Sequence, residues 1–150
     1  MRKMLLTVLV FLLVASISNA FANDAEKEVR KVVTEAYFNG AFNKLDTETM
    51  QKGFHPDFAI FSAKGNEISR YPIATWIEGI EKWKKASDFD AEKAKMDCKI
   101  ANLEVTGGCA MVKVEASKDG KLIYTDYLSL LKFEDGWKIV AKVYHKHTQK

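Results

Sequence analysis

Asp126 and His145 are spaced so that a C-terminal hairpin could present both on one face. The dipeptide at residues 135–136 is Asp-Gly, a strong hairpin turn signal. Pairing Glu134 with Trp137 across this turn puts Asp126 directly opposite His145, and directly opposed residues project from the same face of a sheet. We therefore predict an Asp126–His145 dyad, in which the carboxylate orients an imidazole that moves a proton near neutral pH.

Four other residues are candidates for contact with a ligand. In the same register Tyr124 faces His147, and both could add hydrogen-bond donors beside the dyad. Tyr37, on the first predicted helix, could point its hydroxyl into a cavity, and the indole of Trp76 could stack on a flat molecule. Core packing is an alternative role for Tyr37 and for Trp76.

The other face of the same hairpin carries lysines. Lys138, Lys142 and Lys146 alternate with the predicted dyad face, and we expect them to be solvated or to lie at a dimer contact. Two alternatives to a chemical dyad stay open. The pair could be a partly exposed cross-strand ion pair, and a one-residue bulge would put Asp126 and His145 on opposite faces.

The first half of the chain has helical periodicity. Apolar residues recur every three or four positions in Ala25–Phe42, which predicts an amphipathic helix. Asp46 is a suitable N-cap for a short helix that ends near Lys52. Pro72 suits the first turn of a third helix, and its apolar stripe carries Trp76.

The second half alternates with the period of a β-strand. A short strand is expected at Phe58–Ser62, and from about Lys93 onward turns near residues 106–108, 119–120 and 135–136 divide a four-strand antiparallel meander. Helices followed by a run of strands indicate an α+β fold. A curved sheet covered by helices has a concave face and hence a pocket.

The N-terminus has the features of a secretory signal peptide. Arg2 and Lys3 precede the uncharged apolar run Met4–Val14, and Ala20-Phe21-Ala22 matches a cleavage site. The run is shorter than the roughly 20 apolar residues that span a bilayer. We expect a signal peptide at residues 1–22, a single mature domain at residues 23–150, and a periplasmic or secreted location.

The composition of the mature chain excludes several partners. Removing residues 1–22 lowers the formal net charge from +3 to +1, because Arg2 and Lys3 are the charged residues of that segment. Such a domain lacks the basic surface for nucleic acid and the basic amphipathic helix for a membrane. Without C-x-x-C, H-x-x-x-H or a glycine-rich phosphate loop, neither a metal nor a cofactor is predicted.

Three segments resemble the NTF2-like superfamily, whose members are α+β cones. These segments are Tyr37–Gly40 with the following Leu45-Asp46, the turn and strand start at Phe54–Phe58, and the ending Asp126–Val140. The ending is most similar to the group called putative lumazine-binding proteins. The resemblance spans the mature chain. It implies N-terminal helices packed on a curved antiparallel sheet, a pterin-like or flavin-precursor ligand, and a homodimer formed through the sheet.

This fold hosts both binding proteins and enzymes, so the resemblance leaves three functions open. The first is binding of a small, flat and aromatic organic molecule in the cavity. The second is a metal-independent lyase or isomerase that uses Asp126 and His145. The third is an adaptor that works through its sheet face. Ketosteroid isomerases carry a carboxylate base at the position that matches Ser62 and a second acid at a position that matches near Ser129. The serines at these positions count against the isomerase mechanism.

Overall fold

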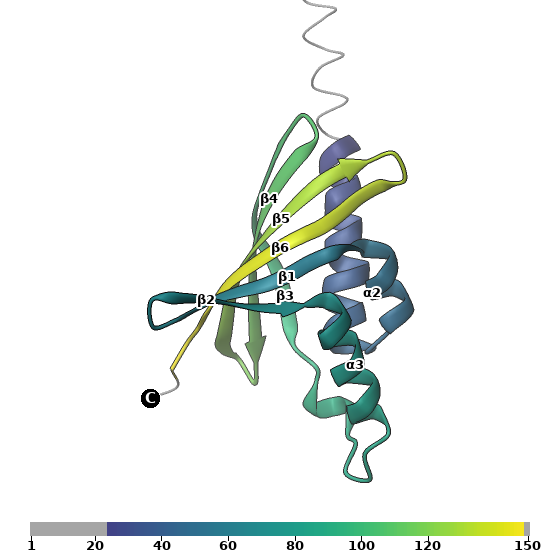
Figure 1. The fold of residues 1–150 in the computed structure, drawn as a ribbon, viewed down its shortest axis with the longest axis vertical. Helices are drawn as coiled ribbons and strands as arrows, with labels where there is room; N and C mark the ends of the chain where they lie inside the picture. Colours follow the sequence, from purple (N-terminus) through teal and green to yellow (C-terminus); the bar gives the residue numbers. More distant parts are fainter. Residues whose placement is uncertain (1–23, 149–150) are drawn as a thin grey trace, which may run out of the picture.

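The computed structural model describes residues 24–148 (Figure 1), so the predicted signal peptide lies outside the described residues. Within the described part, no helix is long and apolar enough to cross a membrane. The elements in chain order are η1 (Val33–Asn43), α2 (Thr47–Gly53), β1 (Phe54–Lys64), β2 (Glu67–Pro72), α3 (Ile73–Lys84), η2 (Ala91–Lys93), β3 (Asp97–Thr106), β4 (Cys109–Lys118), β5 (Lys121–Phe133) and β6 (Gly136–Lys146).

The first helix starts as an α-helix over residues 24–32 and continues as the π-helix η1, which confirms the helix predicted over Ala25–Phe42. Its wider turns are closed by bonds between residues five apart, as where the Lys44 amide donates to the Asn39 carbonyl at 2.8 Å. One side of η1 is buried, and Tyr37 lies at the middle of that side with no exposed surface.

Helix α2 crosses the first helix at close range. Asp46 caps α2 as predicted, and its carboxylate accepts a hydrogen bond from the Thr49 amide at 3.1 Å. The helix ends at Gly53, where an added Cβ would lie 2.2 Å from the Cβ of Ala36. A glycine is therefore required at this crossing.

Helix α3 follows Pro72 and divides its apolar residues between two environments. Ile73 and Ile80 are buried in the core, whereas Trp76 and Trp83 are half-buried. The stripe predicted from the sequence is present, but its two indoles lie at the edge of the core rather than within it.

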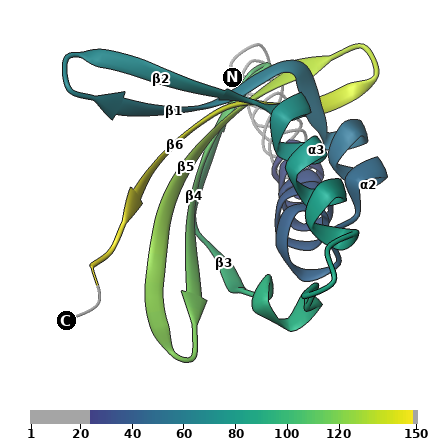
Figure 2. The same cartoon turned by 60° about the horizontal axis from the view of Figure 1, so that its bottom comes forward.

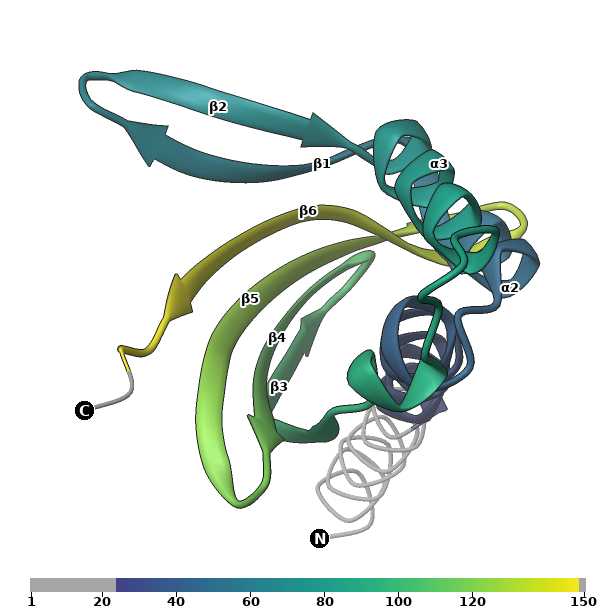
Figure 3. The same ribbon diagram turned by 90° about the horizontal axis from the view of Figure 1, so that it is seen from below.

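The six strands form one sheet in the order β2-β1-β6-β5-β4-β3. Strand β1 runs parallel to β6, and every other neighbouring pair is antiparallel. Figures 2 and 3 show β4, β5 and β6 bending around the side on which the helices lie, while the β1–β2 hairpin projects away from them. The α+β prediction and the four-strand meander are confirmed. Strand β2 was not predicted, and β1 is longer than expected.

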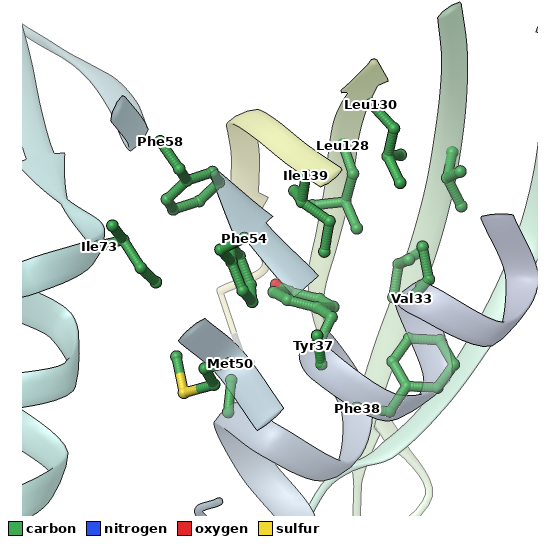
Figure 4. Close-up of a cluster of buried hydrophobic side chains, with 14 of the residues drawn as sticks. Val33, Tyr37, Phe38, Met50, Phe54, Phe58, Ile73, Leu128, Leu130 and Ile139 are labelled. Atoms are coloured by element: carbon green, nitrogen blue, oxygen red, sulfur yellow. The ribbon is translucent and has the colours of Figure 1, made fainter. Parts of the chain in front are cut away.

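The hydrophobic core fills the space between the first helix and the concave face of the sheet. Tyr37 lies among Val33, Phe54 and Ile139 in this core (Figure 4). The sheet contributes alternate residues of β4 and β5, which are buried on this face: Ala110, Val112, Val114, Leu128 and Leu130. Asp126 continues the β5 series, so an acidic side chain stands in line with core residues.

Candidate functional site

The turn between β5 and β6 differs by one position in each strand from the predicted turn. Phe133 pairs with Gly136, where the sequence predicted Glu134 opposite Trp137. Gly136 has a φ of +115°, a conformation that side chains rarely adopt. This shift moves the register by two residues, and because strands alternate with period two it leaves the predicted faces unchanged.

A β-bulge in β6 then exchanges the two faces. Leu130 pairs with Ile139, but Ser129, the preceding residue of β5, pairs with Ala141. Val140 is therefore an extra residue in β6. Beyond it, each side chain of β6 projects from the face opposite to the one that an unbroken alternation predicts.

The predicted Asp126–His145 dyad is therefore wrong. Asp126 pairs with Tyr144, and His145 pairs with Thr125, so the carboxylate and the imidazole project from opposite faces of the sheet. The bulge has the opposite effect on Lys142. The sequence predicts this residue on the solvated face, yet it lies on the concave face and is only 6% exposed.

The second predicted pair is also separated. Tyr124 pairs with Lys146 rather than with His147. The His147 ring lies 2.9 Å from the Thr125 hydroxyl, and its centroid lies 4.7 Å from that of His145. The two histidines thus form a small cluster on the outer face, away from the side of the sheet that carries Asp126.

Asp126, Tyr37 and Lys142 form a buried triad that joins β5, η1 and β6. The Tyr37 hydroxyl donates to Asp126 Oδ2 at 2.7 Å and accepts from Lys142 Nζ at 2.5 Å. Lys142 Nζ also lies 3.0 Å from Asp126 Oδ1. This second contact is an ion pair. It lacks the alignment of a hydrogen bond, and Oδ1 accepts no hydrogen bond from any described residue.

Burial dominates the electrostatics of the triad. It raises the pKa of Tyr37 well above its usual range, and the neighbouring Asp126 carboxylate raises it further. Burial lowers the pKa of Lys142, although the attraction of Asp126 acts in the opposite direction. Lys142 therefore loses its proton to become a neutral amine more readily than a solvated lysine does.

Aromatic rings surround the Lys142 ammonium. Its Nζ lies 5.0 Å from the ring centroid of Tyr37, 5.2 Å from that of Tyr144 and 5.7 Å from that of Trp76. All three distances are within the range in which a ring face attracts a cation. The triad thus holds its positive charge between one carboxylate and three π-systems.

Lys142 lines a cavity between the helices and the sheet. A hollow of about 260 Å³ reaches Lys142 and Tyr144, and it adjoins a larger hollow of about 500 Å³ toward η2. Both hollows share the same aromatic wall: Phe42, Tyr71, Trp76 and Tyr124. Cavities of this size, mainly apolar with a few polar groups, are typical of small-molecule sites.

Of the predicted contact residues, Trp76 and Tyr124 line this cavity. Tyr37 does not have a free hydroxyl, because that group is used within the triad. Ser62 lies in the smaller hollow, whereas the Ser129 hydroxyl contacts Met111 on the outer face. Within residues 24–148, no group of three His, Cys, Asp or Glu side chains could hold a metal ion.

Sequence reasoning missed Lys142. One local signal was available, because residues 139–141 read Ile-Val-Ala, and three successive apolar residues interrupt the alternation of a half-buried strand. Such a run is compatible with a bulge. It does not by itself say which residue is the extra one, so the face of Lys142 could not be inferred.

Solved structures with this arrangement of helices and sheet belong to one fold. An NTF2-like protein of unknown function from Shewanella baltica aligns with a TM-score of 0.64 at 24% identity, over 82% of this chain and 94% of that chain. Another, from Methylobacillus flagellatus, aligns with a TM-score of 0.62 at 27% identity, over 83% of this chain and 94% of that chain. The protein is therefore an NTF2-like α+β cone.

The family within this fold follows from the sequence match. Residues 19–145 match the family described as putative lumazine-binding, and the chain belongs to that family. A curated relative, Aldolase FrzH from Cladobotryum sp., is 26% identical over 122 residues, which are 80% of this chain and 92% of the relative. The predicted fold and family are thus confirmed.

Proposed function

We propose that this protein is exported and that its cavity binds a small, flat organic molecule. One observation carries the proposal: an aromatic-walled cavity of ligand size is lined by Lys142, whose buried side chain pairs with Asp126. The family description supports a ligand of the lumazine type, with a flat ring system that the indole of Trp76 and the phenol of Tyr124 can contact.

The export part of the proposal rests on residues 1–22, whose charged start, apolar run and Ala-Phe-Ala ending are those of a signal peptide. It predicts a mature protein that begins at Asn23 in the periplasm or outside the cell. A denaturing mass spectrum of protein purified from the exported fraction gives the cleavage site directly. Full-length protein confined to the cytoplasm would contradict it.

A homodimer formed through the outer face of the sheet is a further part of the proposal. The superfamily resemblance supports it, and so does a group of exposed apolar side chains that project from this face in neighbouring strands: Met111, Tyr127, Leu131 and Val143. Sedimentation of the mature protein tests it, and Tyr127→Lys is expected to shift the protein to monomer.

Ligand binding is tested first by a native mass spectrum of the exported protein. Extra mass that is lost on denaturation identifies a co-purified molecule. Lumazine is then titrated calorimetrically, and Trp76→Ala is expected to weaken its binding roughly tenfold through loss of ring contact. Phe133→Ala, which removes an exposed ring at the end of β5 that lines neither hollow, is the matched control. Unchanged binding by a folded Trp76→Ala variant would contradict this use of the cavity.

A metal-independent lyase is the second candidate function. The triad favours it, because an amine, a carboxylate and a phenol occupy one buried cluster beside the cavity. The name of the relative Aldolase FrzH, a lyase, adds support. In this candidate Lys142 has the role of proton-transfer group beside Asp126 that the sequence analysis assigns to His145. Turnover of the co-purified molecule, lost in Lys142→Met, distinguishes the enzyme from a binding protein.

A further inference from the structure

The charge at the cavity wall is already balanced within the protein. Lys142 Nζ lies 3.0 Å from Asp126 Oδ1, and both side chains are almost fully buried. An anionic ligand would bring an unpaired negative charge into this apolar site, which is costly. A neutral ligand fits the site better, provided that it has a polar group that reacts with the amine or accepts a hydrogen bond from it.

We propose that Lys142 forms an imine with the carbonyl group of an aldehyde or ketone bound in the cavity. This inference rests on the proposed function, since it names the ligand class of the same cavity. Lys142 lines the smaller hollow, and the aromatic wall beside it accommodates a flat, apolar carbonyl compound. A lysine that reacts this way is desolvated, as Lys142 is.

The triad supplies the proton path for the first step. Lys142 donates to the Tyr37 oxygen, and Tyr37 donates to Asp126 Oδ2, so Tyr37 can take a proton from Nζ as it passes its own proton to the carboxylate. The transfer creates no net charge, because an ammonium and a carboxylate become an amine and a carboxylic acid. This makes a neutral amine available at a site where free charges are costly.

The reaction balances without any other reagent. The Nζ lone pair attacks the carbonyl carbon, the C–O π pair moves to oxygen, and that oxygen takes the proton held by Asp126. A second proton, from nitrogen, converts the hydroxyl to water, which leaves as the nitrogen lone pair forms the C=N bond. Overall, an ammonium and a carbonyl give a protonated imine and one water.

The product keeps the charge arrangement of the resting site. The protonated imine is a cation, so Asp126 stays paired, and the rings of Tyr37, Tyr144 and Trp76 lie around the same positive centre. The other titratable group that acts on Lys142 is the Cys98 thiol of β3. The site is therefore complementary to the covalent product as well as to the free amine.

The test uses the mature protein and benzaldehyde with sodium borohydride, which reduces an imine to a stable secondary amine. Peptide mass spectrometry near neutral pH is expected to locate one benzyl group on Lys142, with roughly 10-fold more adduct there than on exposed Lys146, because the cavity holds the aldehyde beside Lys142. Lys142→Arg is expected to lose this adduct, and Lys146→Arg to keep it.

A parallel calorimetric titration without borohydride separates the two proposals. Benzaldehyde that binds in the cavity but is trapped evenly over surface lysines, or not at all, would overturn the imine and leave the cavity proposal standing. Absence of both binding and trapping would also overturn the imine, while the separate titration with lumazine decides the cavity proposal. If Lys142→Arg does not fold, the distribution of adduct over the wild-type peptides still decides the question.

Discussion

Replacing Asp126 with asparagine removes one charge of the buried pair and keeps an acceptor for the Tyr37 hydroxyl. Lys142 Nζ then loses a carboxylate at 3.0 Å in a site where it is only 6% exposed. At an effective dielectric constant near 20, this attraction is about 5.5 kcal/mol. Removing one partner of a buried ion pair typically costs about 3–5 kcal/mol of the free energy of unfolding.

The loss in free energy of unfolding of Asp126→Asn has an upper limit, because Lys142 can release its proton instead of remaining an unpaired ammonium. From an unfolded pKa of about 10.4, the release costs about 5 kcal/mol at pH 7 and about 1.4 kcal/mol less for each higher pH unit. Since the folded pKa is lowered, the unfolded state binds more protons between the two pKa values. The stability of Asp126→Asn is therefore expected to rise with pH up to about pH 10.

Urea unfolding followed by tryptophan fluorescence measures these free energies. Lys142→Met is expected to cost about as much as Asp126→Asn, because it leaves a buried carboxylate. The double variant is expected to lie within about 1–2 kcal/mol of wild type, since no unpaired charge remains. Glu92→Gln removes an exposed ion pair, Lys95–Glu92, and is expected to leave the free energy almost unchanged.

The single variants decide whether the triad is buried as described. If each single variant costs less than about 1 kcal/mol, the pair behaves as a solvated surface pair and the Lys142 amine is not desolvated. If the two single costs simply add in the double variant, the residues are not coupled and the contact at 3.0 Å does not form in solution.

Three further perturbations address single features. The pKa of Tyr37 is raised on folding, so its contribution to stability is present below about pH 10 and is lost above it, and Tyr37→Phe should remove this alkaline loss. Burial raises the pKa of Cys98 to about 12, with Asp126 adding to the effect, so iodoacetamide at about pH 8 should label Cys109 first. Gly53→Ala should destabilise by about 1–3 kcal/mol, because its Cβ would overlap a neighbour at 2.2 Å.

Each of these expectations has a contrary result. Urea titrations at several pH values compare how much free energy of unfolding wild type and Tyr37→Phe lose above about pH 10. Equal losses would show that the Tyr37 hydroxyl is solvated. Equal labelling of Cys98 and Cys109, read by peptide mass, would show an open β3 edge. Gly79→Ala is the control for Gly53→Ala, since an added Cβ there lies 3.4 Å from the Tyr71 hydroxyl and meets no backbone.

Local patterns in the sequence predict most of the fold. The helical stripe of Ala25–Phe42, the Asp46 cap and the turns of the meander are each encoded within a few residues, and all are present. Strand β2 was missed because its residues, Glu67–Pro72, are almost all exposed on both faces and show no alternation of apolar and polar residues. It exists as a strand because β1 provides a pairing partner.

The sequence by itself determined most of the helices and strands, the family, and Asp126 as an acid in line with core residues. The tertiary structure decided the partner of that acid. The bulge at Val140 places Lys142 beside Asp126 and turns His145 outward, because a single extra residue reverses every later face of a strand. Its position is set by β6 pairing with β1 and β5 at once, which no local pattern encodes.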